Sequence, residues 1–258
     1  MPIAIIEVML PIIIGAGRGR RLKEMTDDMP KCLVPIRGKR ILDWILQALQ
    51  GAGLGNPVFI GGYLIEVLKQ HYPDFVYCHN DNWANNNILA SLFYAEEHMA
   101  DGFICTYSDI VYKAVVVQKA LDHPGDIVLC VDTDWRTRYL GRTEHPESDG
   151  ETLIFEGDRV VKVHRDIPAD QASGEYIGVA KFTPRGAAQL KEVYHDVLSK
   201  FAGKPWREAV VFEKAYKILI FQEMIERDIP FHMVPTHGEY IEIDTQQDYA
   251  WANEHWKG

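Results

Sequence analysis

Short apolar runs alternate with segments of helical periodicity through the first half of the chain. The apolar runs predict buried strands, and segments with apolar residues at three- and four-residue spacing predict helices. The predicted strands cover residues 9–14, 57–62, 74–80, 103–112 and 126–135, and the predicted helices cover 41–52, 64–72, 87–99 and 115–123. Strands that alternate with helices predict a mostly parallel, mixed sheet flanked by helices, which is a Rossmann-like α/β fold.

The pattern changes within residues 139–163, where turns and short hairpins replace the alternation. Regular elements then return: a strand at 174–182, helices at 185–201 and about 210–226, two strands within 230–243, and a last helix at 244–256. Asp244 or Thr245 has the side chain to cap that helix. Because no linker-like segment interrupts the chain, we predict a single domain, with a first portion at about 9–131 and a second at about 132–258.

The 258 residues carry a net charge of −10, which argues against binding to nucleic acid or to an anionic membrane surface. Residues 18–40 depart from this balance, with eight Lys or Arg and three Asp or Glu. A local excess of positive charge in an acidic chain indicates a bound polyanion. The four cysteines are far apart and lack metal-type spacing, so we expect reduced thiols and a cytoplasmic protein.

The first ten residues, MPIAIIEVML, are apolar but contain Glu7 and lack the basic start and cleavage site of a signal peptide. No apolar run reaches the length of a membrane-spanning helix. We therefore expect neither a signal peptide nor a membrane span.

A loop rich in glycine and arginine follows the first predicted strand, within IIIGAGRGRRLKEMTDDMPK at residues 12–31. Three glycines would let backbone N–H groups approach a ligand closely: Gly15, Gly17 and Gly19. Three arginines would fork onto phosphate oxygens: Arg18, Arg20 and Arg21. The alternative is a solvated basic turn, but a strand running into such a loop favours a polyphosphate cradle.

Two common phosphate-binding motifs do not fit this loop. A Walker A loop requires Gly-Lys followed by Ser or Thr, and the chain has no such triplet. A dinucleotide fingerprint requires a third glycine where Arg20 stands. It also requires an acidic residue after the second strand, which instead ends in glycines within PVFIGGY.

The order G-x-G-x-R-L at residues 17–22, followed by Thr26 and Pro30-Lys31, resembles the signature of nucleotidyltransferases that activate sugar phosphates and related phosphates. The resemblance implies the fold of the nucleotide-diphospho-sugar transferases. It also implies that Arg21 and Lys31 hold the triphosphate of an NTP and act in catalysis. The remaining loop residues would contact the nucleotide: Gly15, Ala16, Gly17, Arg18, Gly19 and Arg20.

The reaction of such enzymes is attack of an anionic phosphate oxygen on the α-phosphorus of the NTP, which releases pyrophosphate and needs no general base. It does need neutralisation of charge, which Mg²⁺ held by carboxylates supplies. Asp109, where a strand ends in YSD, and Asp244, in EYIEID, match the positions of the family's metal aspartates. The alternatives are a turn residue for Asp109 and a helix cap for Asp244.

The nucleotide base would lie near the ends of the second and third strands. Gly62 and Tyr63 follow the second strand, where the small residue lets a base lie flat. The run NDNWANNNILASL offers amide and hydroxyl groups, of which Asn87 and Ser91 are the candidates. Asn-rich turns also serve as ordinary helix caps.

Residues 130–146, CVDTDWRTRYLGRTEHP, and 239–249, EYIEIDTQQDY, resemble the cytidylyltransferases that activate phosphocholine, aminoethylphosphonate and similar small headgroups. This resemblance spans residues 9 to about 255. It implies CTP as the nucleotide, bound by the first portion, and an acceptor bound by the second. The chain departs from the pattern by about eight extra N-terminal residues, by Gly15 in place of a common alanine, and by two further arginines in the loop.

Carboxylates and aromatic rings occur together in the second portion. This combination stabilises an ammonium group by charge and by cation–π contact, worth about 0.5–2 kcal/mol per ring. The candidates for the acceptor site are Asp132, Asp134, Trp135, Tyr139, Glu175 and Tyr176. Arg142 and His145 are candidates for the acceptor phosphate. Aromatic residues in such number also serve as core, which is the alternative.

Two further functions stay open at this point. One is a nucleotidyltransferase that uses another NTP and a sugar 1-phosphate. The other is a regulatory protein that binds a nucleotide without turnover, although both candidate metal carboxylates are present. The sequence leaves the oligomeric state open, with a homodimer as one option.

Overall fold

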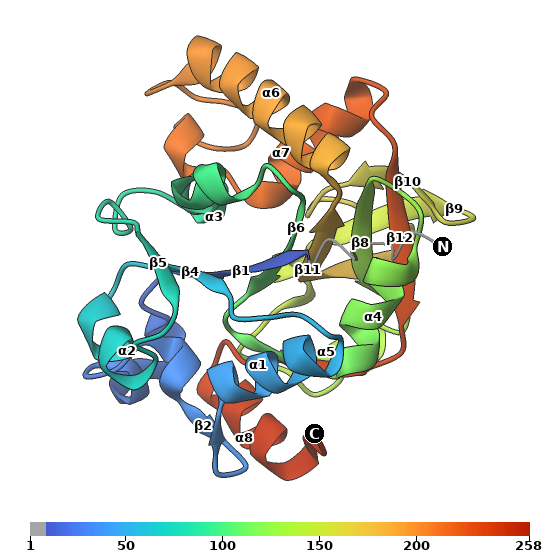
Figure 1. Ribbon diagram of the computed structural model, residues 1–258. Helices are drawn as coiled ribbons and strands as arrows, with labels where there is room; N and C mark the ends of the chain where they lie inside the picture. Colours follow the sequence, from blue (N-terminus) through green and yellow to red (C-terminus); the bar gives the residue numbers. More distant parts are fainter. Residues whose placement is uncertain (1–8) are drawn as a thin grey trace, which may run out of the picture.

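The computed structural model describes residues 9–258 (Figure 1). Residues 1–8, which hold most of the segment MPIAIIEVML, lie outside the described residues. Within the described range, nine strands form one sheet in the order β5-β4-β1-β6-β11-β8-β12-β10-β9. The strand bounds are β1 Leu10–Gly15, β4 Val58–Gly61, β5 Val76–His79, β6 Phe103–Tyr107, β8 Ile127–Asp132, β9 Thr152–Glu156, β10 Arg159–Val163, β11 Gly174–Phe182 and β12 Phe231–Thr236.

The sheet is mostly parallel, as predicted. Strands β1, β4, β5 and β6 pair in parallel, and so do β8 and β12. Strand β11 runs antiparallel between β6 and β8, and β10 runs antiparallel to β12 and β9. Strand β9 also pairs with the start of β11, so the second half of the sheet closes into a ring. The open end of this ring becomes one wall of the site.

Helices cover both faces of the sheet (Figure 1). Their bounds are α1 Ile41–Gly51, α2 Ile65–His71, α3 Ile88–Leu92, α4 Ala114–Asp122, α5 Arg136–Tyr139, α6 Pro184–Phe201, α7 Lys217–Glu226 and α8 Gln246–His255. Helices α3, α6 and α7 pack on one face, and α1, α2 and α4 pack on the other. Each central strand is therefore buried on both sides, and the β-branched run Ile12–Ile14 suits it because apolar side chains are needed on both faces.

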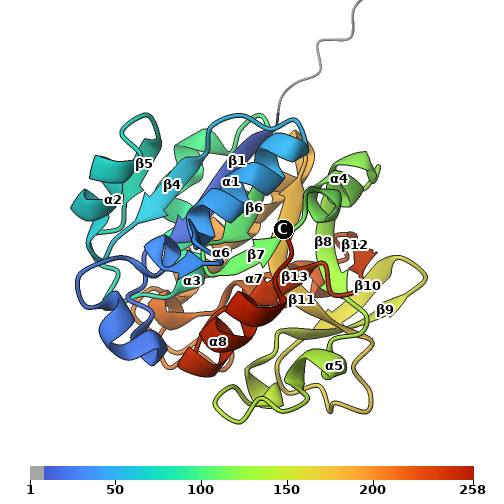
Figure 2. The same ribbon diagram turned by 90° about the horizontal axis from the view of Figure 1, so that it is seen from below.

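Two short two-stranded sheets lie outside the main one. β2 (Pro35–Ile36) pairs with β3 (Lys39–Arg40). β7 (Ile110–Tyr112) pairs antiparallel with β13 (Tyr240–Glu242), beside α8 (Figure 2). The second pair joins residues far apart in the sequence, and the site depends on it.

The expected single strand at 103–112 is therefore wrong, because the chain divides into β6 and β7. The Ser108 N–H still donates to Ile14 O of β1 at 3.2 Å. The next carbonyl, Asp109 O, accepts from Ile243 N at 2.9 Å and so belongs to the other ladder. The change of partner turns the backbone out of the main sheet at Asp109.

Two expected helices are shorter than predicted. The segment 87–99 is an α-helix only to Leu92 and then tightens into the 3-10 helix η3 (Phe93–His98). The segment 210–226 becomes helical at Lys217. Before Lys217, the carbonyl group of Glu213 does not take part in an α-helix. It accepts from Asn87 N at 2.8 Å and thus satisfies a free donor at the start of α3.

Thr245, and not Asp244, caps α8. The Thr245 hydroxyl accepts from Asp248 N, and the Asp248 carboxylate accepts from Thr245 N, which is a capping box. The Asp244 side chain is therefore free to face the site.

None of the helices in residues 9–258 is both long and apolar enough to cross a membrane. The four cysteines are free and buried, as expected for reduced thiols.

Candidate active site

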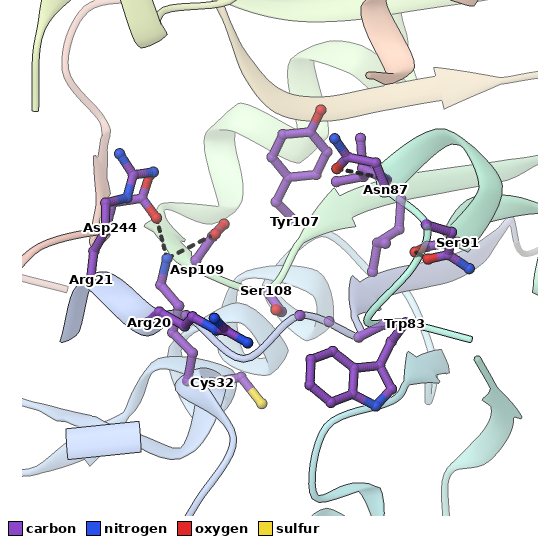
Figure 3. Close-up of a pocket in the computed structure, with 18 residues that line it drawn as sticks. Arg20, Arg21, Cys32, Trp83, Asn87, Ser91, Tyr107, Ser108, Asp109 and Asp244 are labelled. Atoms are coloured by element: carbon purple, nitrogen blue, oxygen red, sulfur yellow. Dashed lines mark hydrogen bonds and ion pairs between the residues drawn. The ribbon is translucent and has the colours of Figure 1, made fainter. Parts of the chain in front are cut away.

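A cavity of about 390 Å³, here called the first pocket, opens at the carboxyl ends of β1 and β6 (Figure 3). The chain goes from β1 to β4 on one side and later returns to β6 on the other. The cavity thus lies at the topological switch point, where open α/β sheets bind ligands. Its walls come from the glycine- and arginine-rich loop, the segment before α3, and the strand ends that carry Asp109 and Asp244.

The loop contributes most of the residues expected to bind a nucleotide. Those that line the first pocket are Gly15, Ala16, Gly17, Gly19, Arg20 and Arg21. Gly19 has a φ of 69°, and a Cβ there would lie 2.7 Å from the Cδ of Lys31. Only glycine allows both the turn and the passage of the Lys31 side chain, so this position shapes the cationic wall.

The structure places three expected nucleotide contacts outside the described wall of the first pocket: Arg18, Gly62 and Tyr63. The Arg18 guanidinium pairs with Asp27 at 2.7 Å and lies 5.4 Å from the ring centroid of Tyr63. The Tyr63 hydroxyl donates to the carbonyl of Thr26 at 2.9 Å. These contacts direct both side chains along the outside of the loop, where they hold its shape.

Lys31 lies between the two predicted metal carboxylates. Its ammonium group is 3.0 Å from Asp109 Oδ2 and also pairs with Asp244 Oδ1. Burial alone would lower the pKa of Lys31, but the two carboxylates outweigh it and raise that pKa above its ordinary value. Lys31 is thus a fixed positive charge at neutral pH.

Arg21 stands on the other side of Asp244. Its guanidinium is 2.6 Å from Asp244 Oδ2 and 2.8 Å from Asp149 Oδ2. Burial favours the protonated form of Asp244, yet Lys31 and Arg21 together lower its pKa below the ordinary value. The carboxylate is therefore ionised, as a metal ligand must be.

The β7–β13 ladder brings Asp109 and Asp244 together. Ile110 pairs with Glu242, and Ile243 N donates to Asp109 O at 2.9 Å. The buried Asp109 Oδ1 accepts no hydrogen bond from the described part of the chain. An unpartnered carboxylate oxygen beside a second carboxylate fits a hard cation such as Mg²⁺.

A further set of ligand-type atoms adjoins this pair. His145, Glu242 and Asp244 each offer one atom, all within 4.8 Å of one another. Arg142 Nη2 lies 3.6 Å from Glu242 Oε2 and Arg142 Nε lies 2.8 Å from Asp248. Burial, together with the charge of Asp244, raises the pKa of Glu242 well above its ordinary value. Asp244 is thus one member of a larger charged network.

An amide cluster forms the opposite wall of the first pocket. Buried Asn80 donates to Asn86 Oδ1 and to Ser91 Oγ, each at 2.9 Å, and Asn86 donates back to Asn80 Oδ1. Asn87 caps α3, and its own amide also donates to Lys214 O. Both predicted residues, Asn87 and Ser91, line the pocket, together with the unpredicted Trp83 and Asn86. A fixed amide beside an aromatic face can read the edge and face of a base.

A second pocket of about 260 Å³ adjoins the first. The residues that line both are Arg21, Asn87, Ile88, Tyr107, Asp109 and Asp244. Its remaining polar walls come from β11, with the predicted Glu175 and Tyr176, from β13, and from the connections before β9, β11 and α7. The two predicted metal aspartates and Arg21 thus stand at the junction of two cavities.

Carboxylates and tyrosines dominate the second pocket. Glu175 accepts from the hydroxyl groups of Tyr139 at 2.5 Å and Tyr240 at 3.3 Å. Burial raises the pKa of Glu175 to about 7, although these hydrogen bonds favour its ionised form. A carboxyl group that titrates near neutral pH in a cleft is a candidate for ligand recognition.

The structure does not bring Asp132, Asp134 and Trp135 to the described wall of the second pocket. Asp132 is buried against Arg138 Nε at 3.0 Å and accepts from Asp134 N. Trp135 is 3% exposed and packs edge-on against Tyr139. Because the chain turns into α5 directly after β8, Asp132 and Trp135 fold back on their own segment and support the pocket from behind, whereas Asp134 is exposed and lies 3.4 Å from His237 Nδ1.

Tyr139 and Arg142 lie one layer behind the second pocket. Tyr139 reaches it through the hydrogen bond to Glu175, and Arg142 through its ion pair with Glu242. Their expected contact with the acceptor is therefore replaced by contact with residues that line the cavity.

The sequence predictions missed several lining residues of the second pocket: Tyr107, Glu151, Arg165, Tyr216, Tyr240 and Glu242. Tyr240 and Glu242 precede Asp244 at two-residue spacing, so strand periodicity places the three on one face. This alternation in the sequence could have predicted Tyr240 and Glu242 as lining residues. Glu151, Arg165 and Tyr216 come from three separate segments without a shared motif.

Comparison with known proteins supports one family throughout. The family described as MobA-like NTP transferase domain matches residues 11–179. The CTP:phosphoglutamine cytidylyltransferase of Campylobacter jejuni is 30% identical, over 93% of this chain and 97% of that protein. The choline-phosphate cytidylyltransferase of Streptococcus pneumoniae is 32% identical, over 93% of this chain and 95% of that protein.

A solved structure of the CTP:phosphocholine cytidylyltransferase from Streptococcus pneumoniae superimposes with a TM-score of 0.71 and 20% identity, over 96% of this chain and 99% of that one. This likeness confirms the predicted fold, a nucleotide-diphospho-sugar transferase type with a mostly parallel sheet.

Proposed function

This chain belongs to the MobA-like NTP transferase domain family and is a nucleotidyltransferase of the cytidylyltransferase type that acts on phosphorylated small molecules; on that premise we propose that it transfers CMP from CTP to a small phosphate or phosphonate whose headgroup carries a positive nitrogen. The observation that carries the proposal is the pair of adjoining pockets with Asp109, Asp244 and Arg21 at their junction.

The first pocket suits the nucleotide. The glycine loop, Arg20, Arg21 and Lys31 offer backbone N–H groups and positive charge to a triphosphate. Trp83 and the amide held by Asn80 offer a face and hydrogen bonds to a base. This arrangement would place the α-phosphate beside the junction of the pockets.

The junction suits phosphoryl transfer between two anions. The attacking oxygen of the acceptor is ionised at neutral pH, so the protein has only to align it and neutralise charge. Lys31 and Arg21 are positive charges held in place by carboxylates, and they would stabilise charge that develops on the α-phosphate and the departing pyrophosphate. Asp109 and Asp244 would hold Mg²⁺, which supplies further charge neutralisation and orients the phosphates.

The second pocket suits an amine. Tyrosines 107, 176, 216 and 240 line it together with Glu151, Glu175 and Glu242. An ammonium group near such rings gains about 0.5–2 kcal/mol per ring, and the carboxyl oxygens can accept its hydrogen bonds. A sugar would call instead for uncharged hydrogen-bonding groups around its hydroxyls.

One assay tests the proposal. The purified protein with Mg²⁺ is given CTP, ATP, GTP or UTP and a panel of phosphorylated amines, aminophosphonates and sugar 1-phosphates, and pyrophosphate release is measured. We expect CTP and an amine-bearing acceptor to be used far better than any other pair. Comparable rates with UTP and a sugar phosphate would move the chain to the sugar-nucleotide enzymes. Nucleotide binding without pyrophosphate release would indicate a regulatory protein.

A further inference from the structure

The part of the second pocket that lies outside the first holds a positive charge that an amine acceptor alone does not explain. Arg165 lines this pocket but not the first. We propose that Arg165 binds a carboxylate of the acceptor, so that the acceptor is a phosphorylated or phosphono amino acid with a zwitterionic headgroup. This inference rests on the function proposed above and narrows its substrate class.

The guanidinium of Arg165 is held in position but has free donors. Its central carbon lies 3.8 Å from the ring centroid of Tyr216, a stacking contact that fixes the plane of the group. Among the described residues it makes no hydrogen bond, and its buried Nε has no partner. An arginine with unused N–H groups in a cleft is suited to bind an oxyanion in two-point fashion.

The neighbouring Glu151 does not satisfy these donors. Its Oε1 is 3.6 Å from Arg165 Nη2, which is beyond a hydrogen bond. Its Oε2 accepts from the Tyr107 hydroxyl at 2.8 Å, and this bond holds the carboxylate on the side of Tyr107. Glu151 therefore offsets the positive charge of Arg165 electrostatically, while the N–H donors of Arg165 stay free for a ligand.

The position of Arg165 separates it from the transferred phosphate. Arg21 stands at the junction, where the acceptor phosphate has to meet the nucleotide, and Arg165 stands among residues that line the second pocket alone. There it shares the wall with Glu175 and Tyr240, whose groups attract a positive nitrogen. A pocket wall that holds both a guanidinium and acidic side chains matches a headgroup with both a carboxylate and an ammonium. For a purely cationic headgroup such as choline, a free guanidinium in the same cavity would be repulsive.

The test uses acceptors in pairs that differ only by the carboxylate. The pairs are O-phosphoserine with phosphoethanolamine, O-phosphohomoserine with 3-aminopropyl phosphate, and 2-amino-3-phosphonopropionate with 2-aminoethylphosphonate. For each, kcat/KM is measured with CTP in the wild type, Arg165→Met and Arg165→Lys. Arg136→Met is the matched control, since Arg136 also lies over an aromatic ring, Trp135, but outside the described walls of both pockets.

We expect the wild type to prefer the carboxylate-bearing member of at least one pair by roughly 10- to 100-fold, as for a charged hydrogen bond. Arg165→Met should abolish this preference by slowing only that member, Arg165→Lys should retain part of it, and the KM for CTP should not change. Arg136→Met should keep the preference.

Three outcomes would overturn the inference. Equal kcat/KM within every pair, or transfer only to carboxylate-free acceptors, would show that no carboxylate is recognised while leaving the proposed transferase function intact. Equal losses for both members in Arg165→Met would assign Arg165 to the shared phosphate. Failure of every acceptor would count against the proposed function itself and against this inference with it.

Discussion

The two pockets differ in how they are built. The cationic wall of the first comes largely from one stretch, residues 15–32, where a loop and two short 3-10 helices, η1 (Arg20–Thr26) and η2 (Lys31–Leu33), follow β1. The second gathers single residues from β6, the β8–β9 connection, β11, β13 and the segment before α7. A site made by a loop's backbone leaves a motif in the sequence, whereas a site made by strand-end side chains leaves scattered residues. On the proposed assignment of the pockets, recognition of the nucleotide would be local, and recognition of the acceptor would be a tertiary property.

The largest effect should come from the residues that the pockets share. We expect Asp109→Asn and Asp244→Asn each to lower kcat by roughly three orders of magnitude, because a bound metal contributes several kcal/mol to the transition state. Both variants should remain folded by circular dichroism. The control is Asp101→Asn, an exposed carboxylate outside the described walls of both pockets. Full activity in EDTA, or in both variants, would refute the metal assignment.

A support residue of the second pocket should affect stability rather than selectivity. Trp135 is buried behind Tyr139, so Trp135→Ala should destabilise the fold by about 3 kcal/mol or more. Thermal unfolding and the KM values of both substrates are the measurements. Trp251→Ala, which alters a half-exposed ring, should leave the melting temperature nearly unchanged. A rise in the acceptor KM alone, at unchanged stability, would instead place Trp135 in contact with the headgroup.

A substitution confined to the first pocket should act on the nucleotide only. Asn86 is held by two hydrogen bonds with Asn80, so its amide is preset toward the cavity. Removing it in Asn86→Ala should raise the KM for CTP by up to about tenfold, the value of one hydrogen bond. The KM of the acceptor should stay the same, and Asn82→Ala, on the exposed side of the same turn, should change neither. An equal rise in the KM of the acceptor would contradict the proposal that the two substrates bind in separate pockets.

The smallest expected effect is a pH dependence specific to the second pocket. Burial raises the pKa of Glu175 to about 7, so rising pH through 7 ionises it and should increase kcat/KM for an amine acceptor severalfold. The acceptor phosphate itself ionises near pH 6, at about the second pKa of a phosphate ester. Glu175→Gln therefore provides the baseline, and its profile should lack the rise near pH 7.

The same titration has the opposite sign for stability. The folded state holds the proton of Glu175 more tightly than the unfolded chain, so the stabilising contribution is complete below the ordinary pKa of 4.5 and is lost as pH rises toward about 7. Glu175→Gln should flatten this part of the stability profile in denaturant titrations. A stability that rises through this window only in the wild type would contradict the protonated, buried carboxyl group.

Much of the fold was predictable because its central strands are buried on both faces. The run Ile12–Ile14 and the strand at 127–132 have apolar side chains on both sides, which is a strong local signal. The boundaries at Asp109 and Lys217 were missed because hydrogen-bonding partners from distant segments decide where those elements end. The family and its enzyme class were also within reach of the sequence, and the comparisons confirm them.

In the site, local chain geometry accounts for what the sequence could predict. Arg21 and Lys31 reach the first pocket because a glycine-rich turn between β1 and η2 (Lys31–Leu33) admits one compact path for the backbone. Asp109 and Asp244 were predicted as metal ligands from the resemblance to the family's motifs, with Asp109 where a strand ends. Their common contact with Lys31 depends on the β7–β13 ladder, which joins residues more than a hundred positions apart.

Only the tertiary structure shows which side chains of the second portion face a ligand. Trp135 and Asp132 look like headgroup ligands in the sequence, yet the turn after β8 packs them behind the wall. Arg165 and Tyr216 have no local pattern, yet the fold brings the central carbon of the Arg165 guanidinium to 3.8 Å from the ring centroid of Tyr216. The physical reason is that a local pattern fixes the periodicity of a segment, whereas the direction in which a given side chain is buried depends on the partner that packs against it.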